Sequence, residues 1–107
     1  MKNLIWRLPI ICSIIITSIY SSIFASNTYV VEAGSNYYSP ADLTISAGDV
    51  VSWTNVQGFH NVNFDINSIT GNPYNNPSDV GSLGAVSGNS NGVDIGSITF
   101  SVPGTYY

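Results

Sequence analysis

The residue with the clearest capacity for chemistry is His60, the single histidine of the chain. A neutral imidazole can offer one ring nitrogen to a metal ion while a hydrogen bond fixes the other nitrogen. His60 lies where a loop ends and a strand pattern resumes with Asn61 and Val62, which predicts a position at one end of a β-structure. One ligand does not make a metal site. The residue alone therefore leaves a metal ligand and an ordinary hydrogen-bonded loop histidine both open.

Other catalytic groups are scarce after position 26. That part of the chain has no lysine, arginine or cysteine and no second histidine. A Ser-His-Asp triad could be assembled on paper around His60, but the sequence contains no nucleophile elbow to present the serine. The composition therefore predicts that the protein is not an enzyme.

The charge distribution is one-sided. Of the 107 residues only two are basic, Lys2 and Arg7, and six are acidic, so residues 26–107 carry a formal charge of −6. The acidic residues are Glu32, Asp42, Asp49, Asp65, Asp79 and Asp94. Nucleic-acid binding through phosphate neutralisation needs clustered cations and is excluded. The negative charge favours a cationic protein partner through electrostatic steering, or simply keeps the domain soluble.

The first 25 residues have the pattern of a secretory signal peptide. Lys2 and Arg7 supply a positive start, Leu8 to Ile19 is apolar, and Ala25 is a small residue suited to cleavage. The apolar run is short for a membrane span, which needs about 20 residues, although an uncleaved anchor is the competing interpretation. Cys12 lies inside this run, so cleavage would leave no cysteine. We expect export to the periplasm or the medium, with no membrane span after cleavage.

The remaining residues, 26–107, are predicted to form one all-β domain. Apolar and polar residues alternate with period two, the signature of half-buried strands. The predicted strands lie at 29–33, 43–46, 51–54 and 97–102, and a further one begins at 105–107. Residues 70–77 and 81–96 are predicted loops, with Asn91-Gly92 as a turn. Short strands with polar turns favour an antiparallel sandwich or barrel. Because the last strand stops after its first residues, we expect a fragment cut near its C-terminus.

Four segments occur in an order that resembles one known family. They are Tyr37-Tyr38-Ser39-Pro40 before Leu43-Thr44-Ile45, the run from Ala47 to Asn55, His60-Asn61-Val62, and the run from Ile98 to Tyr107. Together they resemble the aromatic-x-Pro segment, the Gly-Asp-x-Val-x-Trp-x-Asn strand, the first ligand motif and the Phe-x-x-Pro-Gly-Thr-Tyr strand of plastocyanin/azurin-type blue copper proteins, the cupredoxin family.

The resemblance implies a cupredoxin-like Greek-key sandwich over residues 26–107, lacking its last strand and ligand loop. His60 is then one ligand of a single type 1 copper, and Asn61 is the residue that ties the ligand-bearing segments together by hydrogen bonds. The Cys, second His and Met ligands would follow residue 107 in the complete protein. The expected function is one-electron transfer to redox partners such as a cytochrome, with the oligomeric state open.

Two other interpretations remain open at this stage. One is a metal-free exported β-sandwich used for adhesion or glycan binding, with exposed tyrosines and Asn-rich loops. The other is a cupredoxin domain of a larger redox enzyme. A multicopper oxidase is disfavoured because Asn61 and Val62 follow His60, which leaves no His-x-His pair.

Overall fold

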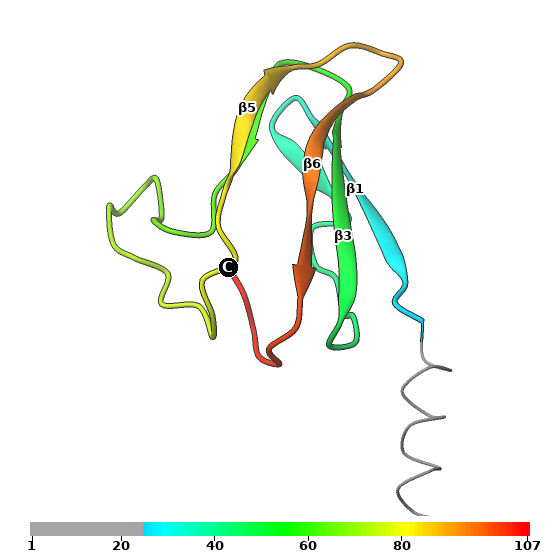
Figure 1. Ribbon diagram of the computed structural model, residues 1–107. Coiled ribbons are helices and arrows are strands. Elements are labelled where there is room, and N and C mark those ends of the chain that lie inside the picture. The colour runs from blue at the N-terminus through cyan, green and yellow to red at the C-terminus, as the bar shows by residue number, and fades with distance from the viewer. Residues whose placement is uncertain (1–24) are drawn as a thin grey trace, which may run out of the picture.

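The computed structural model describes residues 25–107, and all of their regular structure is β (Figure 1). Six strands follow one another: β1 (Thr28–Gly34), β2 (Tyr37–Ser39), β3 (Asp49–Asn55), β4 (Phe59–Val62), β5 (Leu83–Ser87) and β6 (Val93–Phe100). The predicted all-β class is confirmed. No helix in residues 25–107 is long and apolar enough to cross a membrane. The signal peptide predicted for residues 1–25 lies, apart from Ala25, outside the described residues.

The strands form two sheets. The larger has the order β2-β1-β3-β6, and the smaller is the pair β4-β5. β1 and β3 run parallel, with Val31 opposite Trp53, whereas β3 and β6 run antiparallel, with Val51 opposite Ile98. Figure 1 shows β5 standing across from β6, with the loop of residues 63–82 projecting to the side. The arrangement is a small sandwich whose second layer has two strands.

The core follows from the period-two alternation in the sequence. Successive side chains of a strand point to opposite faces, so every second residue of β3 faces the same layer. The buried apolar cluster takes Val31 from β1, Val51 and Trp53 from β3, and Val62 from β4. The last two members, Ile98 and Phe100, come from β6. Since Val62 belongs to the smaller sheet, this cluster is what holds the two sheets together.

Aromatic rings extend the core toward the end of the chain. Phe64 packs edge-on against Trp53 at a centroid distance of 5.9 Å and against Phe100 at 5.6 Å. Phe100 in turn meets Tyr106 at 4.9 Å. Edge-to-face pairs at such distances stabilise by about 1 kcal/mol each beyond the burial of their area. The residues after β6 are therefore held to the core although they form no strand.

Two predicted strand positions are wrong. Residues 43–46 alternate in sequence but form no ladder; Leu43 is 39% exposed, and Ile45 alone packs against the core. Residues 105–107 are also irregular. Conversely, the predicted loop at 81–96 contains β5 and the start of β6. β5 includes Gly84 and Ala85, residues with weak strand preference, so its pairing with β4 overrides local propensity. The Asn91-Gly92 turn is confirmed, with Gly92 donating to the Asn89 carbonyl at 2.8 Å.

Asp49 joins the beginnings of β1 and β3. Its side chain is 3% exposed. One carboxylate oxygen accepts the Asn27 backbone N–H at 2.9 Å, and the other accepts the Ser46 backbone N–H at 2.9 Å. Gly48, with a φ of 96°, makes the turn immediately before it. The carboxylate therefore fixes both the turn and the entry of the chain into the first strand.

We expect Asp49→Ala to lower the free energy of unfolding by about 2 kcal/mol, because two backbone donors lose charge-assisted hydrogen bonds. Denaturant titration of the complete gene product measures the change. Asp94→Ala is the matched control: Asp94 is exposed on β6, and its loss should change stability by no more than about 0.5 kcal/mol. Equal effects for the two variants would contradict the role given to Asp49.

Candidate metal centre

His60 is the second residue of β4 and lies at the end of the smaller sheet that adjoins the 56–58 loop. It pairs with Val86 of β5. Its side chain is half-buried, between Phe59, which is 70% exposed, and Asn61, which is also exposed. Val62 then turns into the core. The alternation along this short strand presents the imidazole at the boundary between the core and solvent.

Gly58 lies near one edge of the imidazole. Its φ of 82° is a left-handed value that glycine adopts without strain. A Cβ built at this position would lie 3.3 Å from His60 Nε2 and 3.7 Å from its Cδ2. The Nε2 edge therefore faces the backbone of the preceding loop. Nδ1 is the ring atom opposite that edge, which makes it the nitrogen directed away from Gly58.

A buried amide holds the loop that carries Gly58. Asn55 is 0% exposed, and its Nδ2 donates to the Gly58 carbonyl at 3.0 Å and to the Val86 carbonyl at 2.9 Å. Its Oδ1 accepts the Gln57 backbone N–H at 3.1 Å. The Gly58 carbonyl also accepts the Gly88 N–H at 2.7 Å. Asn55 thus connects the end of β3, the loop before His60 and the residue paired with His60.

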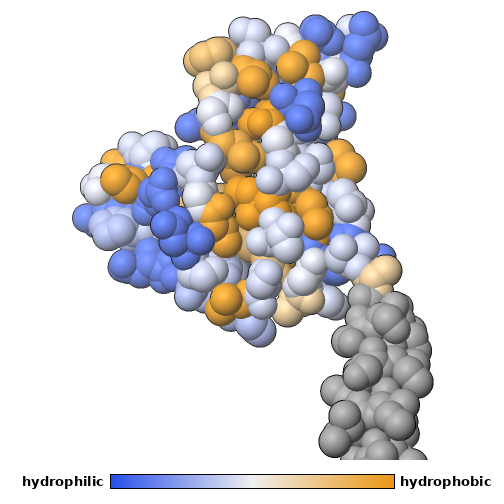
Figure 2. Space-filling view, viewed as in Figure 1, coloured by the Kyte–Doolittle hydropathy of each residue, from blue (hydrophilic) through white to orange (hydrophobic). Residues whose placement is uncertain are grey.

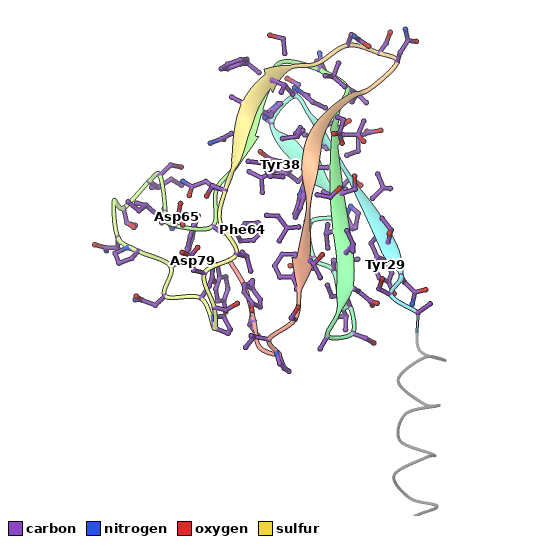
Figure 3. The ribbon with its side chains drawn as sticks, viewed as in Figure 1. Tyr29, Tyr38, Phe64, Asp65 and Asp79 are labelled. Atoms are coloured by element: carbon purple, nitrogen blue, oxygen red, sulfur yellow. The ribbon has the colours of Figure 1, made fainter. Side chains whose placement is uncertain are left out.

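A tyrosine from the other sheet also reaches this strand. Tyr38 of β2 donates its hydroxyl to the Asn61 carbonyl at 2.6 Å. Its ring meets the His60 ring edge-on, with centroids 5.8 Å apart and planes at 74°. Burial raises the pKa of Tyr38, so the phenol stays protonated and able to donate at neutral pH. Figure 3 labels Tyr38 between the smaller sheet and the strands of the larger one.

The residues present fit one ligand of a copper site. A type 1 centre takes two histidines, a cysteine thiolate and a weak axial ligand. Residues 25–107 contain one histidine and neither cysteine nor methionine, and they bring together no group of three or more His, Cys, Asp or Glu side chains. His60, with one nitrogen directed away from the backbone, can serve as a ligand. The described residues do not by themselves supply the sulfur donors.

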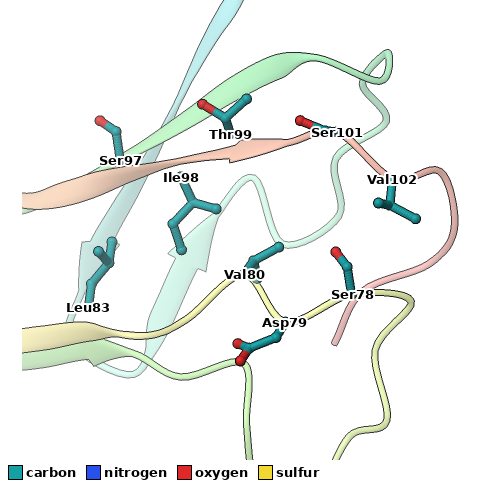
Figure 4. Close-up of a pocket in the computed structure, with 9 residues that line it drawn as sticks. All are labelled: Ser78, Asp79, Val80, Leu83, Ser97, Ile98, Thr99, Ser101 and Val102. Carbon is teal, nitrogen blue, oxygen red and sulfur yellow. The ribbon is translucent and has the colours of Figure 1, made fainter.

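A cavity within residues 25–107 lies away from His60. It has a volume of about 550 Å³ and opens between β6 and the segment before β5 (Figure 4). Serine and threonine hydroxyls and aliphatic side chains line it, and Asp79 is its one ionisable residue. Figure 2, drawn in the view of Figure 1, shows apolar side chains gathered along the middle of that face. Since His60 does not line this cavity, the cavity is not part of the candidate metal centre.

The sequence is 38% identical over 73 residues to a plastocyanin from Synechococcus sp. (strain JA-2-3B'a(2-13)). Over this stretch the chain is similar to a plastocyanin. The similarity covers 59% of this chain and 54% of that protein, so the chain spans about half the length of the plastocyanin it matches. The predicted resemblance is confirmed, and the two-sheet all-β architecture agrees with the cupredoxin sandwich that the homology implies. No family model matches the chain, and no solved structure does.

Sequence reasoning placed His60 and Asn61 side by side and missed two residues that hold them. Asn61 contributes its backbone carbonyl, while its side chain is exposed. Asn55 could have been found, because it continues the buried face of Val51 and Trp53, and a polar residue at a core position needs partners. Tyr38 gave no local signal, since it lies 23 residues from its partner in sequence.

Proposed function

We propose that the complete protein is an exported blue copper protein that carries one electron, with His60 as one ligand of a single type 1 copper. The observation that supports this most directly is the similarity to a plastocyanin, at 38% identity over 73 residues. The role of Asn61, as a residue that links the ligand-bearing segments, belongs to the same proposal.

The described residues would hold the ligand in place. When bound, the copper would supply a reversible change between Cu(II) and Cu(I). β4 and β5 fix the backbone of His60, Gly58 lies against its Nε2 edge, and Nδ1 is left for coordination. A ligand whose backbone is paired within a sheet changes position little between oxidation states, which would favour rapid electron transfer. The Cys, second His and Met ligands would come from a segment outside residues 25–107.

The location and partners follow from the N-terminal pattern and the charge. A cleaved signal over residues 1–25 would send the domain to the periplasm or the medium. With six acidic residues and no lysine or arginine, residues 26–107 would be steered toward a cationic redox protein such as a cytochrome. Raising the salt concentration would slow such an encounter.

Copper titration of the complete gene product tests the proposal. We expect one Cu(II) per chain and an intense visible charge-transfer band that disappears on reduction and returns on oxidation. A gene product with no sulfur ligand and no such band would contradict the proposal, and would leave a metal-free β-sandwich for adhesion or glycan binding. A reading frame with further domains would instead indicate part of a larger redox enzyme.

A further inference from the structure

The strand that carries His60 is irregular where it leaves the ligand. Phe59 pairs with Ser87 and His60 with Val86, but Val62 pairs with Leu83, so the register shifts after His60. Asn61 lies at this shift without a cross-strand partner in the register. An irregularity of this kind weakens the local ladder and re-aims nearby side chains. The two-stranded sheet therefore holds His60 less firmly than a regular ladder in a larger sheet would.

Tyr38, which lies on the larger sheet, contacts β4 at this irregular position. Its hydroxyl donates to the Asn61 carbonyl at 2.6 Å, and its ring packs edge-on against the imidazole at 5.8 Å. Tyr38 itself is fixed by the pairing of β2 with β1, where it lies opposite Ala33, a fully buried residue. One side chain thus contacts both the imidazole of His60 and the backbone carbonyl of the next residue, Asn61.

The geometry points to Tyr38 as a positioning residue for the metal ligand, which clamps β4 to the larger sheet through the Asn61 carbonyl and restricts rotation of the His60 ring. This inference rests on the proposed function, because it concerns how the ligand is held. The inference goes beyond the proposed function because it assigns the positioning of His60 to a residue of β2, a strand that contributes no ligand. The hydroxyl sets the strand position, and the ring sets the imidazole orientation.

Tyr37 provides a matched control on the same strand. Its hydroxyl donates to Glu32 Oε1 at 2.7 Å, an exposed bond within the β1–β2 hairpin. Tyr37→Phe and Tyr38→Phe each delete one hydroxyl and keep the ring. A general effect of losing a tyrosine hydroxyl should appear in both variants, whereas loosening of the ligand strand should appear only in Tyr38→Phe.

The test compares wild type and the two variants of the complete gene product. In the metal-free protein, we expect the amide protons of β4 to exchange about five- to tenfold faster in Tyr38→Phe, as the loss of one hydrogen bond of typical net strength implies. With Cu(II) bound, we expect the band and the reduction potential to shift in Tyr38→Phe and to stay at wild-type values in Tyr37→Phe.

The outcomes separate this inference from the proposed function. If Tyr38→Phe matches Tyr37→Phe in exchange, band and potential while wild type binds copper, the role of Tyr38 is overturned and the proposed function stands. If wild type binds no copper, the proposed function fails and with it the role of Tyr38 toward a ligand. Faster exchange in Tyr38→Phe together with a shifted potential supports the inference.

Discussion

Replacing His60 with glycine is expected to weaken copper binding by the complete protein more than about 100-fold and to remove the visible band. The loss of a residue that merely supports a ligand reduces metal affinity by about 10- to 100-fold, and loss of the ligand itself should exceed this. His60 is half-buried at the sheet boundary, so its removal leaves a small space that opens to solvent. Titration with Cu(II), followed by absorbance, measures both effects.

Added imidazole distinguishes a ligand from a structural histidine. If His60 coordinates the metal, free imidazole should enter the space in the glycine variant and restore part of the band, because it supplies the missing nitrogen. Ser101→Ala, at an exposed position beyond β6, should bind copper as wild type does. Wild-type affinity in His60→Gly without imidazole would show that the ligand is another residue.

The buried face of the larger sheet could be predicted from sequence because it depends on a local pattern. Val51 and Trp53 alternate with polar residues within one strand, and Ile98 and Phe100 do so in another. Period two is a property of the extended backbone itself, so it survives without knowledge of the partner strand. The same reasoning fails at Leu43–Ile45, where the alternation is present but no neighbouring strand pairs with it.

The contacts around the candidate site depend instead on residues that lie far apart in the sequence. β5 contains Gly84 and Ala85 and is a strand only because β4 lies beside it. Tyr38 reaches Asn61 across the gap between the two sheets, which no local pattern encodes. The position of His60 at the end of a loop was predictable from its neighbours, but the residues that fix its orientation come from β2 and β3. Sequence patterns therefore located the candidate ligand, but they did not identify the residues that hold it in place.

Among these supports, Asn55 should matter most for stability. We expect Asn55→Asp to lower the free energy of unfolding by about 3 kcal/mol or more at neutral pH, since the change keeps the shape and replaces a donor by an acceptor. In the wild-type protein Nδ2 donates to two carbonyl oxygens, those of Gly58 and Val86. A carboxylate at this buried position would face the two carbonyl oxygens with no hydrogen to donate, and it would have no contact with water.

The pH dependence identifies the cause of this loss. Protonation of the new carboxyl restores one donor, so the folded state of Asn55→Asp binds a proton more tightly than the unfolded state. Its stability relative to wild type should therefore recover as the pH falls and decline as the pH rises. Denaturant titrations at several pH values measure this, with Asn61→Asp as the control, because that side chain is exposed and should change stability by no more than about 0.5 kcal/mol. A deficit in Asn55→Asp that is the same at every pH would mean that the donor is not what matters.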